Sequence, residues 1–268
     1  MNEPIAILLA AFGTTISQAR KSYDLLEEGV RRRFPSAAVR WAYTSSIVRA
    51  RLAERGEPID SPAEALARWS QEGVDRVVVQ SIHVTPGEEF LRLTGLQQER
   101  MTLIFGRPLL DQDADYEAVL DALADQVVPA VPTIFVGHGN NNDPVFNLAN
   151  KRMDQLVRGR FSNAILASLE GAPGPSALNE MIPMARQVGK AHFVPLLFVA
   201  GDHVVNDLLG EEATSWKNQL GIEQVTCGPP LGQIDAIREV YIEHLGQAVR
   251  QSCLMNEASI PTDGPTIQ

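Results

Sequence analysis

The chain of 268 residues is poor in cysteine, in aromatic side chains and in positive charge. Its two cysteines, Cys227 and Cys253, stand in no Cys-x-x-Cys or Cys/His ligand spacing, so we expect two free thiols in a reducing compartment. A formal net charge of −10 argues against a general nucleic-acid binder, whose surface would be basic. The sequence has no apolar run near the roughly 18 residues of a membrane span, so we expect no membrane segment.

Several signatures of enzymes are missing as well. The turn Phe12–Thr15 opens a predicted helix, which suits an anion, but it has neither the GxGxxG pattern nor the lysine of a phosphate-binding loop. A nucleotide site is therefore weakly supported, and a plain strand-to-helix turn explains the segment about as well. GxSxG is also absent, which disfavours acyl transfer. Residues 5–12 follow Glu3 and no basic residue, so they predict a buried strand rather than a signal peptide, and a cytoplasmic protein.

Short apolar runs alternate with amphipathic segments, and this order predicts an α/β fold with parallel sheets. The predicted strands are residues 5–12, 38–43, 77–82, 101–105, 134–136, 164–169 and 193–199. Ser61 and Glu64, with Pro62 at the first helical position, predict a capping box. Ser176 is expected to cap a later helix that ends near Gly189, and residues 111–115 are read as a helix entry rather than a calcium loop.

The second half of the chain repeats the plan of the first half. In each half a first strand ends in a glycine turn and a late strand ends in a loop with a histidine: His83 follows Gly13 by 70 residues, and His203 follows His138 by 65. We expect lobes at residues 1–128 and 129–233. A helix at 234–254 would place Ile237, Tyr241, Leu245 and Val249 on one face and pack back on the first lobe; residues 255–268 would form a mobile tail.

Ligands of such sheets bind beyond the carboxyl ends of the strands, where His138 and His203 are both expected. Two imidazoles there suggest a metal site or a proton acceptor. A single histidine is more often a packing residue, whereas two at equivalent turns favour function, and two histidines with a carboxylate could hold a metal of intermediate softness. The other candidates at these ends are His83, Glu88, Glu89, Glu170 and Asp202, with solvated loop charges as the alternative for the glutamates. His192 and His244 fit simple packing.

Several motifs together resemble one family, the anaerobic cobalt chelatases of cobalamin biosynthesis, or CbiK-type class II chelatases, which are related to ferrochelatase. The motifs are residues 8–14, 41–44, 80–83, 86–90 and 137–139, and the most specific segment, Ala200-Gly201-Asp202-His203 with Asn206-Asp207 and Ser215-Trp216. The resemblance runs from about residue 5 to residue 250. It implies two flavodoxin-like lobes in a pseudo-twofold relation, which agrees with the duplication.

The resemblance also implies an activity, the ATP-independent insertion of Co²⁺ into sirohydrochlorin or precorrin-2, with cobalt as a substrate and no organic cofactor. Carried over by motif, His138 is a metal ligand and the acceptor of pyrrole protons, His203 and Glu170 are further metal ligands, and Glu89 stands on the opposite wall as a catalytic residue. The residues expected to contact the macrocycle are Phe12, Gly13, Thr14, Tyr43, His83 and Phe90, with core packing as the alternative for the aromatic ones.

Two alternatives stay open. Ligand type alone does not separate cobalt from iron or nickel, so a ferrochelatase or a nickel chelatase acting on the same macrocycle is one alternative. The other is a carrier that closes two lobes on a metal or tetrapyrrole without turnover. The expected partners are the tetrapyrrole and a divalent metal, without nucleic acid or membrane, and a homo-oligomer is left open.

Overall fold

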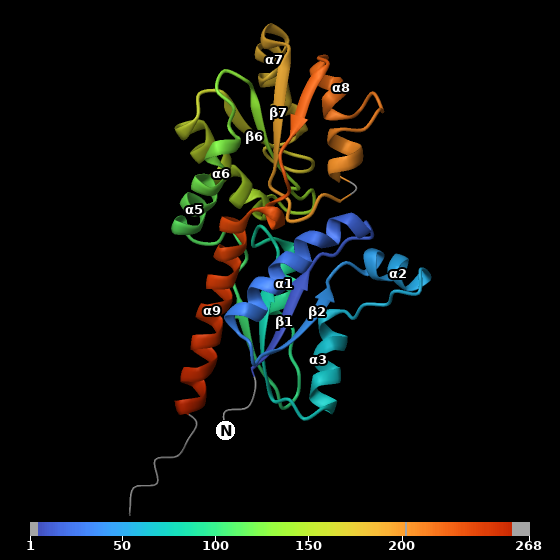
Figure 1. The fold of residues 1–268 in the computed structure, drawn as a ribbon, viewed down its shortest axis with the longest axis vertical. Coiled ribbons are helices and arrows are strands. Elements are labelled where there is room, and N and C mark those ends of the chain that lie inside the picture. The colour runs from blue at the N-terminus through green and yellow to red at the C-terminus, as the bar shows by residue number, and fades with distance from the viewer. Residues whose placement is uncertain (1–4, 202, 259–268) are drawn as a thin grey trace, which may run out of the picture.

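The computed structural model describes residues 5–201 and 203–258, and the side chains of these except 203–205 and 256–258. In this part of the chain two four-stranded parallel sheets, β2-β1-β3-β4 and β6-β5-β7-β8, form two lobes stacked end to end (Figure 1). The expectation of two α/β lobes, each with its own parallel sheet, is confirmed.

The first sheet and the elements around it come from the first part of the chain. They are β1 (Ala6–Ala11), η1 (Ser17–Arg20), α1 (Lys21–Arg33), β2 (Ala38–Tyr43), α2 (Ser46–Glu54), α3 (Pro62–Gln71), β3 (Arg76–Ser81), α4 (Glu88–Thr94), β4 (Thr102–Gly106), α5 (Asp113–Leu123) and η2 (Ala124–Gln126). β1 and β3 lie at the centre and are almost wholly buried, as interior parallel strands are; β1 is entirely apolar, and β3 has a core of three valines.

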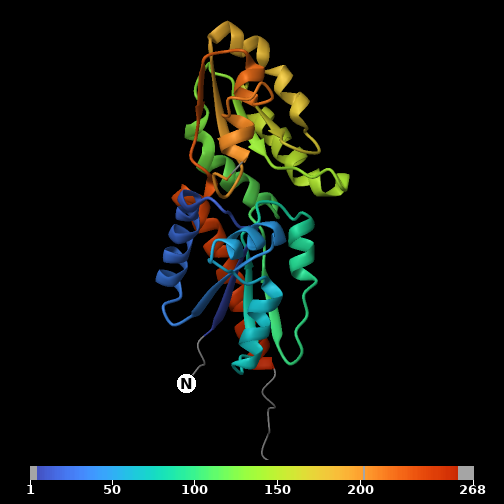
Figure 2. The same cartoon turned by 90° about the vertical axis from the view of Figure 1, so that its right-hand side faces the viewer.

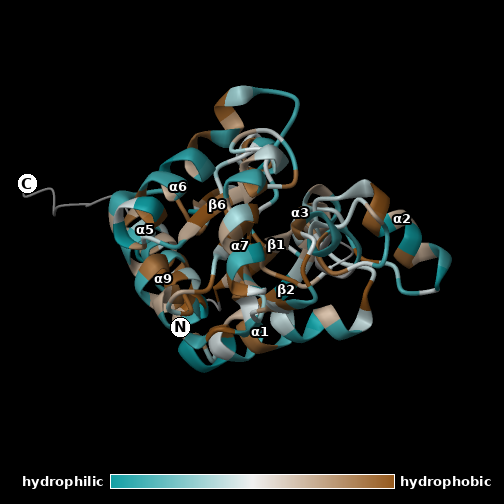
Figure 3. Ribbon diagram, turned by 90° about the horizontal axis from the view of Figure 1, so that it is seen from above, coloured by the Kyte–Doolittle hydropathy of each residue, from teal (hydrophilic) through white to brown (hydrophobic). Residues whose placement is uncertain are grey.

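The second sheet repeats the arrangement. Its elements are β5 (Thr133–Gly137), η3 (Pro144–Asn147), α6 (Leu148–Arg160), β6 (Ala164–Ser168), η4 (Pro175–Glu180), α7 (Ile182–Val188), β7 (Lys190–Pro195), η5 (His203–Leu208), α8 (Trp216–Leu220), β8 (Gln224–Cys227) and η6 (Leu231–Gln233), followed by α9 (Asp235–Ala258). Figure 3 shows brown, apolar strands enclosed by helices with largely teal outer faces.

Local signals in the sequence were partly right. The capping box of Ser61 and Glu64 is present, with Pro62 at the start of α3, and Gly189 ends α7 in the left-handed region. Ser176 does not cap a helix: it lies inside the 3₁₀ turn η4, whose N-cap is Gly174. The predicted strand at 193–199 begins and ends earlier, at Lys190 and Pro195.

Backbone hydrogen bonds fix the correspondence between the lobes. Ser45 N–H donates to the Phe12 carbonyl (3.2 Å), and Glu170 N–H donates to the His138 carbonyl (2.8 Å). Since these two bonds follow equivalent strands, Phe12 and His138 hold the same place in their lobes, as do Ser45 and Glu170.

Two further backbone hydrogen bonds correct one equivalence that the sequence spacing predicted, that of His83 and His203. Leu109 N–H donates to the His83 carbonyl (3.1 Å), and Leu231 N–H donates to the Leu197 carbonyl (2.9 Å). The counterpart of His83 is therefore Leu197 and not His203. Spacing failed here because the segments between the equivalent strands differ in length.

The last helix of each repeat crosses to the other lobe. α9 follows β8 but packs on β3, β4 and α1 of the first lobe, along which it runs in Figures 1 and 2. Its stripe of Ile237, Tyr241 and Leu245 is wholly buried, as the apolar spacing predicted. Within the described residues the helix extends to Ala258 rather than 254, and residues 259–268 of the expected tail lie outside them.

α5 makes the reciprocal crossing, which the sequence gave no reason to expect. It follows β4 but lies beside α6, where Asp113 pairs with Arg152 (2.7 Å) and Asp121 with Arg160 (2.6 Å) (Figure 1). The buried side chains of α5 share one core with Phe135 of the second sheet. The two crossing helices thus tie the lobes together.

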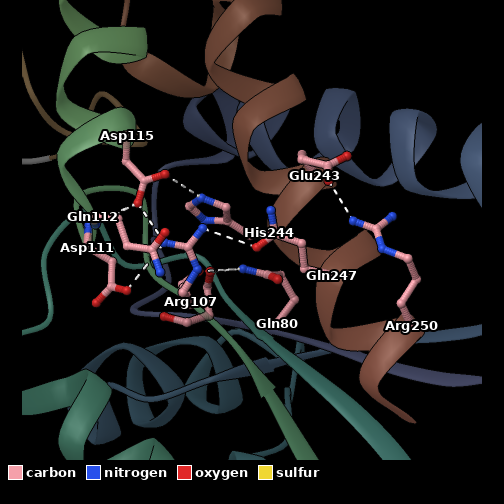
Figure 4. Close-up of polar contacts among 10 residues, drawn as sticks. Gln80, Arg107, Asp111, Gln112, Asp115, Glu243, His244, Gln247 and Arg250 are labelled. Atoms are coloured by element: carbon pink, nitrogen blue, oxygen red, sulfur yellow. Dashed lines mark hydrogen bonds and ion pairs between the residues drawn. The ribbon is translucent and has the colours of Figure 1, made fainter. Parts of the chain in front are cut away.

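A buried polar cluster lies where α5 meets α9 (Figure 4). Asp115 of α5 accepts hydrogen bonds from Arg107 (2.7 Å), from the backbone N–H of Gln112 (2.8 Å) and from His244 Nε2 of α9 (3.0 Å). His244 is 3% exposed, so its packing role is a specific one, joining the two crossing helices. Among the described helices, none combines the length and the apolar character that crossing a membrane needs.

Candidate active site

A cleft of about 390 Å³ opens between the lobes, at the carboxyl ends of both sheets. This is the place where open α/β sheets bind ligands. Most of its wall is apolar and comes from both lobes: Phe12, Val48, Ile82, Val84, Phe90, Phe146, Leu196, Leu197, Phe198 and Val199. A flat, largely apolar ligand fits such a wall, with a few polar side chains to orient it.

His138 follows β5 and its side chain is exposed in the cleft. Its Nδ1 lies 2.9 Å from the carbonyl oxygen of Gly139. A carbonyl only accepts hydrogen bonds, so Nδ1 carries the proton, and the lone pair of the neutral ring resides on Nε2. This backbone contact therefore sets the tautomer that a metal ligand or proton acceptor needs.

Glu170 is brought beside His138 by a close approach of two backbones. At Gly139, where φ is +78°, a Cβ atom would lie 1.7 Å from the carbonyl oxygen of Glu170, so only glycine fits. The backbone N–H of Glu170 donates to the carbonyl of His138, and its half-buried side chain lines the cleft. Asn141 Oδ1 accepts from the N–H of Gly171 (2.9 Å) and fixes the loop that follows.

His83 follows β3 in the first lobe and forms part of the opposite wall. Its ring nitrogens lie 2.9 Å from Ser81 Oγ and 3.4 Å from Thr44 Oγ1. Burial lowers the pKa of His83 to about 4, because the charged ring would lose its hydration. At neutral pH this histidine is therefore uncharged, and its ring forms a polar but neutral part of the cleft wall.

Two glutamates open α4 on the same side of the cleft, a position that favours negative charge. Glu89 pairs with Arg92 (3.3 Å). Glu88 also pairs with Arg92, and it accepts hydrogen bonds across the cleft from Asn142 (2.8 Å) and Asn140 (3.3 Å) of the second lobe. These amide donors, followed by the Arg92 charge, lower the pKa of Glu88.

Most of the predicted site residues meet in this cleft. His138, Glu170, His83, Glu89, Phe12, Gly13, Thr14 and Phe90 all line it. Tyr43 does not: its buried ring lies behind Gly13, where a Cβ atom would come within 2.5 Å of it. Its position is explained by core packing, the alternative considered for the aromatic residues.

The side chains of Asp202 and His203 lie outside the described residues, so the predicted ligand set is described for His138 and Glu170 alone. Among the side chains that the structure does describe, no three His, Cys, Asp or Glu groups converge closely enough to hold a metal ion. Cys227 and Cys253 are free thiols, and His192 contacts Thr226 Oγ1 (2.7 Å) at a distance from the cleft lining.

Sequence reasoning missed several residues of the cleft. Arg51 and Val48 were missed because α2 is a short helix with little amphipathic character. Phe146, Leu196 and Phe198 were assigned to a helix or a strand without a role in binding. The polar loop Asn140–Asn142 was visible in the sequence, but its contact with Glu88 required the structure.

The arrangement combines an imidazole and a carboxyl group on one wall with a largely apolar wall opposite them that also carries several polar side chains. Such a site can accept a proton at Nε2 of His138 and can coordinate a cation through His138 and Glu170. It offers no thiolate, which would bind a soft metal too firmly for release.

Comparison with known proteins gives consistent results. The family model described as Cobalt chelatase (CbiK) matches residues 5–250. The sirohydrochlorin cobaltochelatase CbiKC of Nitratidesulfovibrio vulgaris is 32% identical over 259 residues, covering 91% of this chain and 90% of the relative. The sirohydrochlorin cobaltochelatase of Salmonella typhimurium is 29% identical over 261 residues, covering 92% and 97%.

Solved structures agree at the level of the fold. SirB from Bacillus subtilis with Fe³⁺ superposes with a TM-score of 0.60 at 15% identity, covering 97% of this chain and 100% of that one. The sirohydrochlorin chelatase SirB from Bacillus subtilis subspecies spizizenii in complex with cobalt gives 0.59 at 14% identity, covering 96% and 98%. The two-lobed chelatase architecture is therefore confirmed.

Proposed function

The chain belongs to the cobalt chelatase (CbiK) family, and on that premise we propose that it inserts Co²⁺ into sirohydrochlorin without ATP. The observation that carries the proposal is the placement of His138, with its tautomer set by Gly139, beside Glu170 and across an apolar cleft from the first lobe. The proposal includes precorrin-2 as a substrate form and the cytoplasmic location expected from the sequence.

The reaction exchanges two pyrrole protons for one divalent cation. In the proposed mechanism Nε2 of His138 accepts a proton from a pyrrole N–H and releases it to water, and the second proton leaves by the same route. The two nitrogens so freed replace water and protein ligands around Co²⁺. Imidazole suits this step because its charge changes near neutral pH, whereas a lysine would already be charged.

We propose that His138, Glu170 and His203 hold Co²⁺ before transfer. Nitrogen and oxygen ligands bind a first-row divalent ion firmly enough to orient it and weakly enough to let it go. The proximity of the His138 and Glu170 backbones supports two members of this set. His203 enters through the sequence motif.

The first lobe receives the macrocycle in this proposal. Phe12, Gly13, Thr14, His83 and Phe90 line the wall that would contact the ring, and Glu89, paired with Arg92, would assist delivery of substrate or metal. The neutral state of His83 at pH 7 supports an apolar ring at this surface rather than an anionic group.

The test is anaerobic metal insertion into sirohydrochlorin, followed by the absorbance change of the macrocycle, with Co²⁺, Fe²⁺ and Ni²⁺ compared side by side and spontaneous insertion subtracted. The proposal expects catalysed insertion with the highest kcat/KM for Co²⁺. A higher kcat/KM for Fe²⁺ or Ni²⁺ would show that this ion, and not Co²⁺, is the metal substrate. Tight binding of sirohydrochlorin without faster insertion would identify a carrier.

A further inference from the structure

Arg51 is the one arginine or lysine among the described residues that line the cleft, which also contains the carboxylates of Glu88, Glu89 and Glu170. It lies on α2, whose N-cap Ser45 donates its backbone N–H to the Phe12 carbonyl. Val48 and Arg51 are three residues apart and both line the cleft, so one face of α2 turns toward it. Arg51 is the more exposed of the two, at the outer edge of the apolar wall.

The neighbouring arginines are already engaged. Arg49 donates to the carbonyls of Tyr43 (2.7 Å) and Thr44 (2.9 Å), and Arg55 donates to the carbonyl of Thr15 (2.8 Å). Arg20 pairs with Glu57 (2.6 Å). These contacts hold the turns around the cleft in place.

Arg51 differs from them. Its guanidinium makes no hydrogen bond or ion pair with any residue in the described part of the chain, beyond the backbone bonds of α2 itself. A guanidinium at the edge of a ligand cleft, with all five donors available, matches a carboxylate in size and geometry.

We propose that Arg51 binds a peripheral carboxylate of the tetrapyrrole and fixes which edge of the ring enters beside the first lobe. This rests on the proposed function, because the substrate named there carries acetate and propionate side chains around an apolar ring. Glu88 and Glu89 pair with Arg92, yet the cleft and the chain as a whole remain acidic. A polyanionic substrate therefore needs a local cation, and Arg51 supplies it without touching the reacting nitrogens.

A residue with this role changes substrate binding and leaves the chemical step intact. An exposed ion pair contributes little, about 1 kcal/mol, so Arg51→Met should raise the KM for sirohydrochlorin roughly fivefold. The kcat and the KM for Co²⁺ should stay within about twofold. Arg51→Lys should recover part of the loss, because it keeps the charge but not the two-pronged geometry.

The experiment compares wild type, Arg51→Met, Arg51→Lys and Lys190→Met in anaerobic Co²⁺ insertion, and measures binding of metal-free sirohydrochlorin by its fluorescence. Lys190→Met removes the same charge from the exposed start of β7, at the opposite end of the strand from the cleft, and should match wild type. Arg51→Gln serves in place of the methionine variant if circular dichroism shows a folding defect.

The outcomes separate the two proposals. If wild type does not speed insertion, the proposed function fails whatever Arg51 does. If wild type is active but Arg51→Met keeps the wild-type KM for sirohydrochlorin, the role of Arg51 is overturned. A fall in kcat, or a rise in the KM for Co²⁺, would also overturn it, because either would place Arg51 in the chemistry or the metal site.

Discussion

The turns that follow β1 and β5 occupy the same place in their lobes. Phe12-Gly13 and His138-Gly139 share the backbone path, with φ of +98° at Gly13 and +78° at Gly139. The equivalent backbone bonds to Ser45 and Glu170 complete the match. The side chains differ: the first lobe presents Phe12 beside the helix cap Ser45, and the second presents His138 beside the carboxyl group of Glu170.

This difference shows how two equivalent turns of a duplicated fold can take different functions. Both turns need glycine because a neighbouring segment passes close by, the Tyr43 ring in one lobe and the Glu170 carbonyl in the other. In our proposal the same constraint therefore builds a binding wall in the first lobe and a metal and proton site in the second lobe. The crossing helices α5 and α9 connect the two lobes that carry these walls.

The largest effect on this shared framework should come from Asp115, where the crossing helices meet. Replacing it with alanine leaves Arg107 and buried His244 without their acceptor, which should lower the free energy of unfolding by about 3 kcal/mol in a urea titration at pH 7. Asp121→Ala is the matched control: on the same helix, Asp121 forms an exposed pair, so the loss should be below about 1 kcal/mol.

The Asp115 effect has a defined pH dependence. Burial favours the neutral carboxyl, but the Gln112 N–H, His244 and Arg107 outweigh it and lower the pKa of Asp115. A lowered pKa stabilises the fold above the unfolded value near 3.9 and ceases to do so as pH falls through the folded value. The difference between wild type and Asp115→Asn should therefore shrink in strong acid; an unchanged difference would contradict the assignment.

A substitution at Glu170 should distinguish metal binding by the second lobe from macrocycle binding by the first lobe. Glu170→Gln keeps the backbone bond to His138 but removes the charge, so the KM for Co²⁺ should rise about 10- to 100-fold. The KM for sirohydrochlorin should stay within about twofold. Glu180→Gln, an exposed carboxylate of the same lobe paired with Arg158, serves as control, and an equal effect there would mean a change in overall charge.

The burial of His83 in the wall of the first lobe predicts a pH dependence of the free energy of unfolding. Its pKa falls from 6.5 to about 4 on folding, so protons favour the unfolded chain. The neutral ring is accommodated fully above about pH 6.5, and stability is lost as pH falls from there toward 4. Between pH 7.5 and 5 wild type should lose about 1–2 kcal/mol through this group. His83→Gln should remove that part of the loss; an identical pH profile would show that His83 is solvated.

The smallest effect is expected at Phe12, the counterpart of His138. Phe12→Ala removes part of the apolar wall and should raise the KM for sirohydrochlorin about fivefold, with kcat within about twofold. Ile47→Ala, a change to another exposed apolar residue, on α2 outside the cleft lining, should leave both constants unchanged. A large fall in kcat for Phe12→Ala would show that the first lobe takes part in the chemistry.

The sequence predicted the strands well, because a buried parallel strand such as that at residues 5–12 is a continuous apolar run that ends at a glycine turn. It missed β8, whose four residues alternate between exposed and half-buried positions. The crossing of α5 was also invisible, because an apolar stripe shows that a helix is buried but not which sheet covers it. The equivalence of positions in the two lobes could be assigned only from backbone hydrogen bonds, such as those that Phe12 accepts from Ser45 and His138 accepts from Glu170.

For the site, motifs led to His138, Glu170 and Glu89, since glycine turns at strand ends mark positions where ligands bind. Tyr43 was expected in the cleft because it ends a strand, yet alternation along that strand turns its ring behind Gly13 and into the core. Arg51 was missed for a different reason: its importance depends on its side chain having no partner among the described residues. Glu88 was a candidate from the sequence, but its contacts with Asn140 and Asn142 of the other lobe required the structure.

The most direct test of the division between the lobes is to give the second turn the side chain of the first. In His138→Phe, binding of metal-free sirohydrochlorin and anaerobic Co²⁺ insertion are measured on the same sample. We expect a dissociation constant within about threefold of wild type, and an insertion rate about 100-fold lower or more, because the proton acceptor is gone. Insertion at the wild-type rate, above the spontaneous reaction, would contradict it.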